Sequence, residues 1–498
     1  MKKTGLAIVI TCLGLLTCFG FVYYSNHNIR ITKVELVSPE NSALKEDLSI
    51  SLSEASPLKV EYWKKGDDVK YTTPISEVKV DHLVHLLLLE PGTTYEYRIV
   101  IDGWIDQSTD VLSFQTREAS SWMIHEWIKE DKPHDKTAMG DGLVMLCYRG
   151  YPGYISMVDG EGTIRWYWQD KNLGVRLATI TPRNTILALL APARKDEFKK
   201  PEKGDNKGVA SYYLRTGKIG FVGGTEIAEI DLEGNVLWRT NLEEKGIVFH
   251  HDLRMTDDHK IMSIYRDYKL YDLPDTPTKI DTLWGDGVMI MDTLGNVLDK
   301  WSAWNVWDIS KDIKIKEYAG DRFHFNSVNL DTDGNYLLST PIENQVWKVD
   351  SKSGEIIWKL GKGGDFEMDS SSYFYFQHSV YINRNGDLML FDNGDFSPND
   401  TSKVNKVSRS LAFKLDTEQM KAEVQIDNIL PKEYYTSRMG SAFLMPNDYI
   451  LQTISKTGKV AISNQNGEVL WTLNSHFIPY RAEYIPATLW SDYFKIDQ

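Results

Sequence analysis

The chain has 498 residues, of which 42% are hydrophobic, 12% aromatic and 25% charged. This composition is typical of a globular protein with a sizeable core, and it excludes a disordered, collagen-like or coiled-coil chain. The net charge is −14, from 56 Lys and Arg against 70 Asp and Glu, and the sequence has no basic run. Because contacts to phosphates need clustered Lys and Arg, we expect no nucleic-acid partner.

The N-terminus begins with Lys2 and Lys3, followed by an uncharged apolar segment from Leu6 to Tyr24. At about 19 residues the segment is long enough to span a bilayer, and the lysines favour an N-terminus on the inside. We expect residues 1–29 to be a single-pass membrane anchor that leaves the body of the chain on the extracytoplasmic side. A cleaved signal peptide and a lipoprotein signal at Cys18 are the alternatives, and both also place the body outside the cytoplasm.

The three cysteines are Cys12, Cys18 and Cys147, and the first two lie in this apolar segment. The body of the chain therefore keeps one thiol. A single thiol excludes an intramolecular disulfide and a cluster of thiolate metal ligands in the body.

Residues 30–118 have the pattern of a small β-sandwich. The predicted strands are Ile31–Val37, Leu48–Leu52, Leu58–Trp63, Val84–Leu89, Tyr95–Ile101 and Val111–Phe114. From the end of the strand Val84–Leu89 into the strand Tyr95–Ile101, alternate positions carry Leu89, Pro91, Thr93, Tyr95 and Tyr97. This series resembles the tyrosine corner of fibronectin type III-like sandwiches. We expect this domain to have a positioning or binding role, since it carries no evident catalytic group.

Residues 119–498 contain six copies of a repeated pattern, in which an apolar residue, an Asp or Asn and a turn precede a second apolar run; the turn contains Gly except in the degenerate copy at Asp416. The landmark positions of the copies are Asp159, Asp231, Asp292, Asp350, Asp416 and Asn464. The Asp-x-x-Gly element predicts a hairpin turn between two strands. A period of roughly 60 residues with several strands per copy is typical of a β-propeller. We therefore predict an all-β chain: a six-bladed β-propeller preceded by the sandwich and the membrane anchor.

A second strand–turn–strand pattern lies between these hairpins, and we interpret it as the innermost hairpin of each blade. Its first apolar residues are Ala178, Leu253, Val328, Val380 and Ala442. Two residues before them stand Arg176, His251, Asn326, His378 and Gly440. Four residues before them stand Gly174, Phe249, His324, Phe376 and Arg438. Because the starts of the innermost strands surround one mouth of a propeller's channel, we expect the polar members of both sets to converge there.

The expected pocket holds histidine, arginine and asparagine side chains and no acidic one, which suits an anion. Histidine can also act as a nucleophile or as a general acid and base near neutral pH. Each histidine taken alone could instead be structural. Three histidines could also hold zinc, but Arg176 and Arg438 would repel a cation, so we expect neither a metal nor a cofactor.

Three segments resemble motifs of the bacterial PAPS-independent arylsulfate sulfotransferases, and the resemblance extends over about residues 30–498. They are His251-Asp252-Leu253, His324-Phe325-Asn326-Ser327-Val328 and Phe376-Gln377-His378-Ser379-Val380. The resemblance implies a small β-sandwich joined to a six-bladed propeller, which is the catalytic domain. It also implies that His378 takes the sulfuryl group, that His324 and Asn326 bind the sulfuryl oxygens, and that His251 and the adjacent His250 belong to the pocket.

The implied reaction is a ping-pong transfer from a phenolic sulfate ester to an acceptor phenol through a sulfohistidine. The partners are then these small molecules, with a homodimer left open. The chain departs from the family at one position. The family usually has an arginine after the strand that follows the His-x-Asn-Ser motif, in a Ser-Ser-Arg context. The corresponding segment here is Ser339-Thr340-Pro341, so Pro341 takes the place of that arginine. Arg176 and Arg438 are the candidates to supply that charge.

Two other functions are compatible with the repeats. A non-catalytic envelope-associated propeller that binds a partner or ligand would carry the same hairpins but would not need the clustered histidines. A quinone-dependent dehydrogenase is disfavoured, because such propellers typically have eight blades, bound calcium and often paired cysteines.

Overall fold

The computed structural model describes residues 29–39, 42–103, 106–119, 127–150, 153–192, 223–272, 280–312, 314, 321–395, 406–475 and 477–497. Their elements are β-strands and short 3-10 turns, so this described part of the chain is all-β, as predicted. They form two compact units, one of residues 1–121, 164–166 and 487–498, the other of residues 122–163 and 167–486. The predicted anchor lies outside the described residues except for residue 29. Among the described residues no helix is long and apolar enough to cross a membrane.

The first unit contains two antiparallel sheets. One has the order β1 (Ile31–Val37), β2 (Glu46–Ser56), β5 (Lys79–Leu86). The other has the order β35 (Lys495–Asp497), β4 (Lys70–Thr72), β3 (Leu58–Lys64), β6 (Thr94–Ile101), β7 (Gln107–Ser108), with β8 (Leu112–Gln115) beside β6. Alternate residues of β2 and β3 are buried, because successive side chains of a strand point to opposite faces. Each of the six predicted strands corresponds to one of these strands.

The tyrosine series that leads into β6 forms the hydrogen bond expected of a tyrosine corner. Tyr95 is almost fully buried, and its hydroxyl oxygen accepts a hydrogen bond of 3.1 Å from the backbone N–H of Glu90. The finer assignment to the fibronectin type III type stays a prediction. The C-terminal strand β35, which pairs with β4, was assigned by the sequence to the propeller region and was not predicted to join the sandwich.

The other six sheets of the described residues are antiparallel and have four or five strands each. All their residues except 164–166 belong to the second unit. In the order across each sheet, the first has β34 (Ala482–Ile485), β10 (Leu143–Tyr148), β11 (Tyr154–Val158) and β12 (Ile164–Gln169), and the second has β13 (Leu173–Ile180), β14 (Ile186–Pro192), β16 (Glu226–Ile230) and β17 (Val236–Asn241). The third has β15 (Gly223–Gly224), β18 (Phe249–Met255), β19 (Ile261–Asp272), β20 (Ile280–Met291) and β21 (Val297–Ser302). The fourth has β22 (Ser327–Leu330), β23 (Tyr336–Thr340), β24 (Gln345–Val349) and β25 (Ile356–Gly361). The last two are β26 (His378–Ile382), β27 (Leu388–Asp392), β28 (Arg409–Asp416), β29 (Lys421–Ile429); and β30 (Ser441–Leu444), β31 (Ile450–Ile454), β32 (Lys459–Ser463), β33 (Val469–Ser475), β9 (Trp127–His134).

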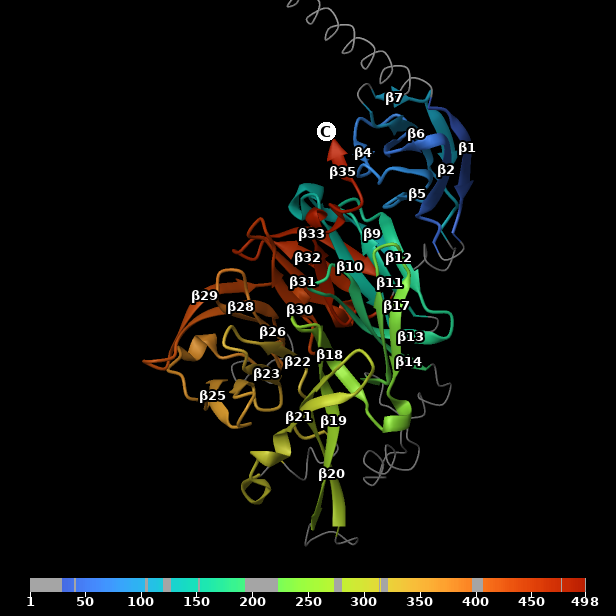
Figure 1. Cartoon of the computed structure of the whole chain (residues 1–498). Helices are drawn as coiled ribbons and strands as arrows, with labels where there is room; N and C mark the ends of the chain where they lie inside the picture. The colour runs from blue at the N-terminus through green and yellow to red at the C-terminus, as the bar shows by residue number, and fades with distance from the viewer. Residues whose placement is uncertain are drawn as a thin grey trace, which may run out of the picture. The chain divides into compact units, whose positions relative to one another are not determined.

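The six sheets have a propeller-like, cyclic arrangement (Figure 1). Contacts run from β13 to β18, β22, β26, β30 and β34 in turn. Strand β34 pairs with β10, and β10 contacts β13, which closes the cycle. All six predicted landmark turns join the last two strands of their own meander, and the five predicted inner hairpins are present.

Local chemistry explains the landmark turns. In the turn between β16 and β17, Asp231 accepts a hydrogen bond of 2.8 Å from the backbone N–H of Asn235. Gly234 has φ of 89°, a conformation that suits glycine because it lacks a Cβ atom. This combination is readable in the sequence because it needs no distant partner.

Two sheets join segments from the two ends of the second unit. Strand β34, near the C-terminus, completes the sheet of β10, β11 and β12, and β9 pairs with β33. The sequence analysis predicted the six outer hairpins but not this closure. The closure adds a sixth inner strand, which is preceded by Tyr480 and Arg481.

Candidate active site

His378 is the first residue of β26 and is 2% exposed. Its Nδ1 atom lies 2.7 Å from Oδ1 of Asn393 and 3.1 Å from the carbonyl oxygen of Phe376. Both partners are acceptors, so Nδ1 carries the proton. The Nε2 atom accepts a hydrogen bond of 3.2 Å from the backbone N–H of Met439 and therefore holds the lone pair. Burial lowers the pKa of His378 to about 3, which keeps the imidazole neutral near pH 7.

Asn393 is a residue that the sequence analysis missed. It is fully buried directly after β27, and its amide nitrogen donates hydrogen bonds to the carbonyl oxygens of Thr436 (2.9 Å) and Met439 (2.8 Å). One side chain therefore fixes both the tautomer of His378 and the backbone that faces its other nitrogen. The only local signal was an Asn at the end of an inner hairpin, which many turns share.

His324 has a charged partner. Its Nδ1 atom is hydrogen-bonded to Oδ2 of Asp321, and Asp321 is also paired with Arg266. Burial acts to lower the pKa of His324, but the carboxylate of Asp321 outweighs it and raises this pKa above its ordinary value. The side chain of His324 is 28% exposed, so it can reach a bound molecule as an imidazolium.

His251 and His250 extend this cluster. The ring centroids of His251 and His324 are 4.7 Å apart, and the Nδ1 atoms of His250 and His251 are 2.5 Å apart. His250 Nε2 lies 3.0 Å from Oδ1 of Asp286, which also pairs with Arg266 at 2.9 Å. Burial lowers the pKa of His250, and burial with the neighbouring His324 and His250 lowers that of His251 well below its ordinary value. Both are therefore neutral donors or acceptors.

The side chain of Phe376 connects the cluster to His378. Its ring centroid lies 6.4 Å from that of His324 and 6.1 Å from that of His378. His251, His324, Phe376 and Met439 have φ angles of 61°, 52°, 57° and 60°. Non-glycine residues rarely adopt this left-handed conformation, and such residues concentrate at functional sites. The sharp turns at the inner strands thus bring residues distant in sequence close together.

Asn326 is fully buried beside this cluster. Its amide nitrogen donates a hydrogen bond of 2.8 Å to the carbonyl oxygen of Gln377, the residue before His378. Its backbone carbonyl accepts a hydrogen bond of 3.3 Å from the hydroxyl of Tyr480. Asn326 therefore holds the backbone that leads to His378, and its expected contact with sulfuryl oxygens stays a prediction.

The two predicted arginines lie in different surroundings. Arg176 is buried, and its Nη1 atom donates a hydrogen bond of 3.0 Å to the carbonyl oxygen of Arg149. The side chain of Arg438 is exposed, so the structure does not bring it into the buried cluster. Arg149 and Arg481 are arginines that the sequence analysis missed. Arg481 precedes the sixth inner strand, and its Nη1 atom pairs with Oδ1 of Asp252 at 2.7 Å.

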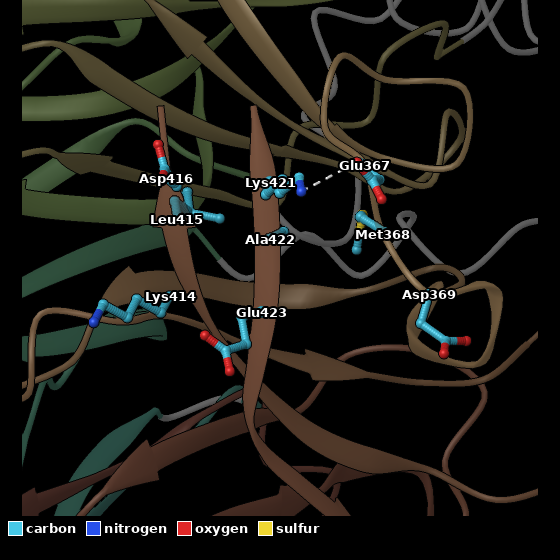
Figure 2. A pocket seen from close by; sticks show the side chains of 9 residues that line it. All are labelled: Glu367, Met368, Asp369, Lys414, Leu415, Asp416, Lys421, Ala422 and Glu423. Atoms are coloured by element: carbon cyan, nitrogen blue, oxygen red, sulfur yellow. Dashed lines mark ion pairs between the residues drawn. The ribbon is translucent and has the colours of Figure 1, made fainter. Parts of the chain in front are cut away.

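A cavity of about 640 Å³ lies against the hairpin of β28 and β29. Figure 2 shows its lining, in which Glu367 and Lys421 form an ion pair of 3.8 Å. The other lining residues are Met368, Asp369, Lys414, Leu415, Asp416, Ala422 and Glu423. It contains none of the predicted site residues, so the histidine cluster is the better candidate for chemistry. Across the described part of the chain, no group of three His, Cys, Asp or Glu residues is placed to hold a metal ion.

Comparisons with known proteins agree with the motifs. The model of a family described as Arylsulfotransferase (ASST) matches residues 129–468. No curated protein matches the chain. Similar solved structures include a protein of unknown function from Bacteroides caccae, with 11% identity over 69% of this chain and 99% of that chain and a TM-score of 0.41.

Two further structures are less similar. A catalytically inactive virginiamycin B lyase from Staphylococcus aureus, solved with quinupristin, has 9% identity, covers 62% of this chain and 72% of its own, and has a TM-score of 0.31. Apo AztD from Citrobacter koseri has 7% identity, covers 86% of this chain and 99% of its own, and has a TM-score of 0.26. At these TM-scores the structures carry no argument about activity.

Proposed function

Because the chain belongs to the arylsulfotransferase family, we propose that it transfers a sulfuryl group from a phenolic sulfate ester to an acceptor phenol, with His378 as the covalent carrier. The proposal includes a six-bladed propeller whose blades are the six sheets, with the histidine cluster at one mouth of its channel. The observation that carries it is the hydrogen bonding of His378, whose Nδ1–H is held by Asn393 and whose Nε2 keeps its lone pair.

In the first half-reaction, the lone pair on His378 Nε2 attacks the sulfur atom. The Nε2–S bond forms as the bond from sulfur to the aryl oxygen breaks, and the phenolate leaves with that electron pair. The ring becomes a positively charged N-sulfo imidazolium, which the Nδ1–H bond to Asn393 stabilises. The N–H of Met439 must release Nε2 before attack, and it can then donate to a sulfuryl oxygen.

His324 manages the phenolic proton in this mechanism. As an imidazolium paired with Asp321, it donates its proton to the departing phenolate oxygen. The neutral His324 then takes a proton from the acceptor phenol, whose oxygen attacks the sulfur of the sulfohistidine. The S–Nε2 bond breaks, and His378 regains its lone pair. Both residues return to their starting protonation states, as a ping-pong cycle requires.

The central experiment measures 4-nitrophenol release from 4-nitrophenyl sulfate, with and without added phenol. We expect phenol to accelerate release, and we expect His378→Asn to reduce it by several orders of magnitude while folding persists. His324→Asn should cost on the order of a hundredfold in the presence of phenol, since it removes a hydrogen-bond donor to the sulfuryl oxygens and the base for the acceptor phenol. His259→Asn, at an exposed turn, is the matched control. Mass mapping after incubation with donor alone should place the sulfuryl group on the His378 peptide; a fully active His378→Asn variant would refute the carrier role.

A non-catalytic propeller that binds an anionic ligand is the second candidate. It is favoured by Pro341 in place of the family's arginine and by the Met439 N–H that occupies Nε2. This candidate predicts binding of aryl sulfates without release of phenol. For either function we propose an extracytoplasmic location, on the basis of the N-terminal apolar segment and its two lysines.

A further inference from the structure

Two side chains that precede strand β34 cross the centre of the cycle of inner strands. The hydroxyl of Tyr480 donates a hydrogen bond of 3.3 Å to the carbonyl oxygen of Asn326, directly before β22. The Nη1 atom of Arg481 donates a hydrogen bond of 2.7 Å to Oδ1 of Asp252 in β18. In the cycle, β13 lies between β34 and β18, and β22 lies beyond β18. Both side chains therefore extend into the space that the inner strands surround, and the side chain of Arg481 is 2% exposed there.

Arg481 lies close to the proposed nucleophile. The backbone N–H of Gly440 donates a hydrogen bond of 3.2 Å to the carbonyl oxygen of Tyr480, the residue before Arg481. The N–H of the residue before Gly440, Met439, is the group bonded to Nε2 of His378. Burial is the largest cause of the low pKa of His378, and the positive charge of Arg481 contributes to it. The guanidinium group is therefore near enough to act on charge that develops at Nε2.

The guanidinium group of Arg481 keeps its charge and has one free donor. Burial acts to lower the pKa of Arg481, but the carboxylate of Asp252 outweighs it and raises this pKa above its ordinary value. Asp252 is fully buried, and its Oδ2 atom accepts a hydrogen bond of 3.0 Å from the backbone N–H of Val328. Within the described part of the chain, the Nε–H of Arg481 is buried without a hydrogen-bond partner. Because a buried donor without an acceptor is costly, this N–H indicates an acceptor that the chain does not supply.

A sulfuryl group fits this free donor. Its oxygens carry negative charge, and hydrogen bonds between charged groups are the strong ones. In the proposed mechanism His324 gives up and regains a proton, so its charge is lost for part of the cycle. A guanidinium group keeps its proton near pH 7, so Arg481 can hold the sulfuryl oxygens in both half-reactions.

We propose that Arg481 is a further catalytic residue, whose Nε–H donates to a sulfuryl oxygen in the donor ester and in the sulfohistidine. The inference rests on the proposed function. Arg481 exchanges no proton: the bonds that form and break are those of sulfur to the aryl oxygen and to Nε2 of His378, and the guanidinium group stabilises the charge on the remaining oxygens. Asp252 is then a positioning residue, because it binds Nη1 and leaves Nε free for the substrate.

The test removes the ion pair between Arg481 and Asp252 from either side, because the two changes alter the charge in opposite directions. In a His378→Asn background, which lacks the nucleophile, calorimetry measures the binding of phenyl sulfate and of phenol. Arg481→Gln should weaken the binding of phenyl sulfate by about tenfold or more, the scale of a charged hydrogen bond, and that of phenol by less than about threefold. Asp252→Asn keeps the arginine's charge and should bind phenyl sulfate at least as tightly as the background. Arg481→Lys should keep part of the affinity, and Arg384→Gln, at an exposed arginine paired with Asp448, should keep all of it.

A double variant keeps the test decisive if a single variant does not fold. Arg481→Gln combined with Asp252→Asn leaves neither partner as an unpaired buried charge, and it should bind phenyl sulfate as weakly as Arg481→Gln. Thermal unfolding of each variant establishes that it is folded. If wild type transfers no sulfuryl group but the binding of phenyl sulfate depends on Arg481 in this way, the proposed function fails and the binding role of Arg481 stands. Unchanged binding of phenyl sulfate in Arg481→Gln, or equal weakening in Arg481→Gln and Asp252→Asn, would assign the pair a purely structural role and overturn the inference.

Discussion

Replacing Asp321 with Asn removes the charge that keeps His324 protonated, at nearly constant size. Asp321 accepts the hydrogen bond from His324 Nδ1, and burial would otherwise lower the pKa of His324. Loss of a carboxylate at this distance lowers an imidazole pKa by about one to three units. Near pH 7 the imidazolium fraction falls accordingly, so proton donation to the phenolate should slow by roughly ten- to a hundredfold. Arg266 keeps Asp286 as an ion-pair partner, so the variant should fold.

The assay is single-turnover release of phenol from two donors at several pH values. Phenyl sulfate has a poor leaving group and needs the acid, whereas 4-nitrophenolate is stable enough to leave with little help. We expect Asp321→Asn to slow the release of phenol from phenyl sulfate by the full ten- to hundredfold, roughly, and the release of 4-nitrophenol from its sulfate by less than about threefold. The rate with phenyl sulfate should recover as the pH falls through the lowered pKa of His324. Arg266 and Asp286 are charged groups that face Asp321 or its partners. Equal slowing of both donors, or an unshifted pH profile, would refute the acid role of His324.

Three further outcomes follow from single contacts. Asn393→Ala should slow sulfuryl transfer by about ten- to a hundredfold, because the Nδ1–H of His378 loses its acceptor at 2.7 Å. His378 should still be sulfated, but slowly. Unchanged kinetics would show that other contacts hold the tautomer of His378. Tyr95→Phe should lower the free energy of unfolding of the sandwich by about 1–2 kcal/mol in urea, since the N–H of Glu90 loses its partner, and no shift in the midpoint would contradict this. The pKa of His378 is about 3 in the folded chain and about 6.5 in the unfolded chain, so between these pH values only the unfolded chain takes up this proton. The free energy of unfolding should therefore decrease as the pH is lowered below 6.5, by about 2 kcal/mol from this group at pH 5. His378→Asn should make the free energy of unfolding less dependent on pH over this range.

The hairpins and the inner strands could be predicted because their signals are local. Asp231 with Gly234 encodes a turn through contacts within a few residues. A related turn recurs in the other sheets of the second unit, with Asn464 in place of Asp in one and no glycine after Asp416 in another. The tyrosine corner at Tyr95 is local in the same sense. The repeat register then placed His251 and His378 at equivalent strand starts, which made a shared site predictable without any structure.

The groups that tune the histidines could not be predicted in this way. Asn393 and Asp321 lie outside the repeated positions that carry the histidines, and each acts through a side-chain hydrogen bond made in the folded chain. Arg438 occupies a repeated position, yet its side chain is exposed. The repeat predicts where the backbone of a residue lies in its sheet, but it does not predict the direction in which a long side chain extends.

The sequence by itself therefore determined the all-β class, the six outer hairpins, the sandwich strands and the histidines at the inner strand starts. Only the tertiary structure decided that β34 closes the cycle against β10 and that β35 joins the sandwich. Pairing between strands more than 300 residues apart leaves no periodic trace in either strand. The protonation of His324 and His378 is likewise a tertiary property, because burial and a neighbouring carboxylate move their pKa values in opposite directions.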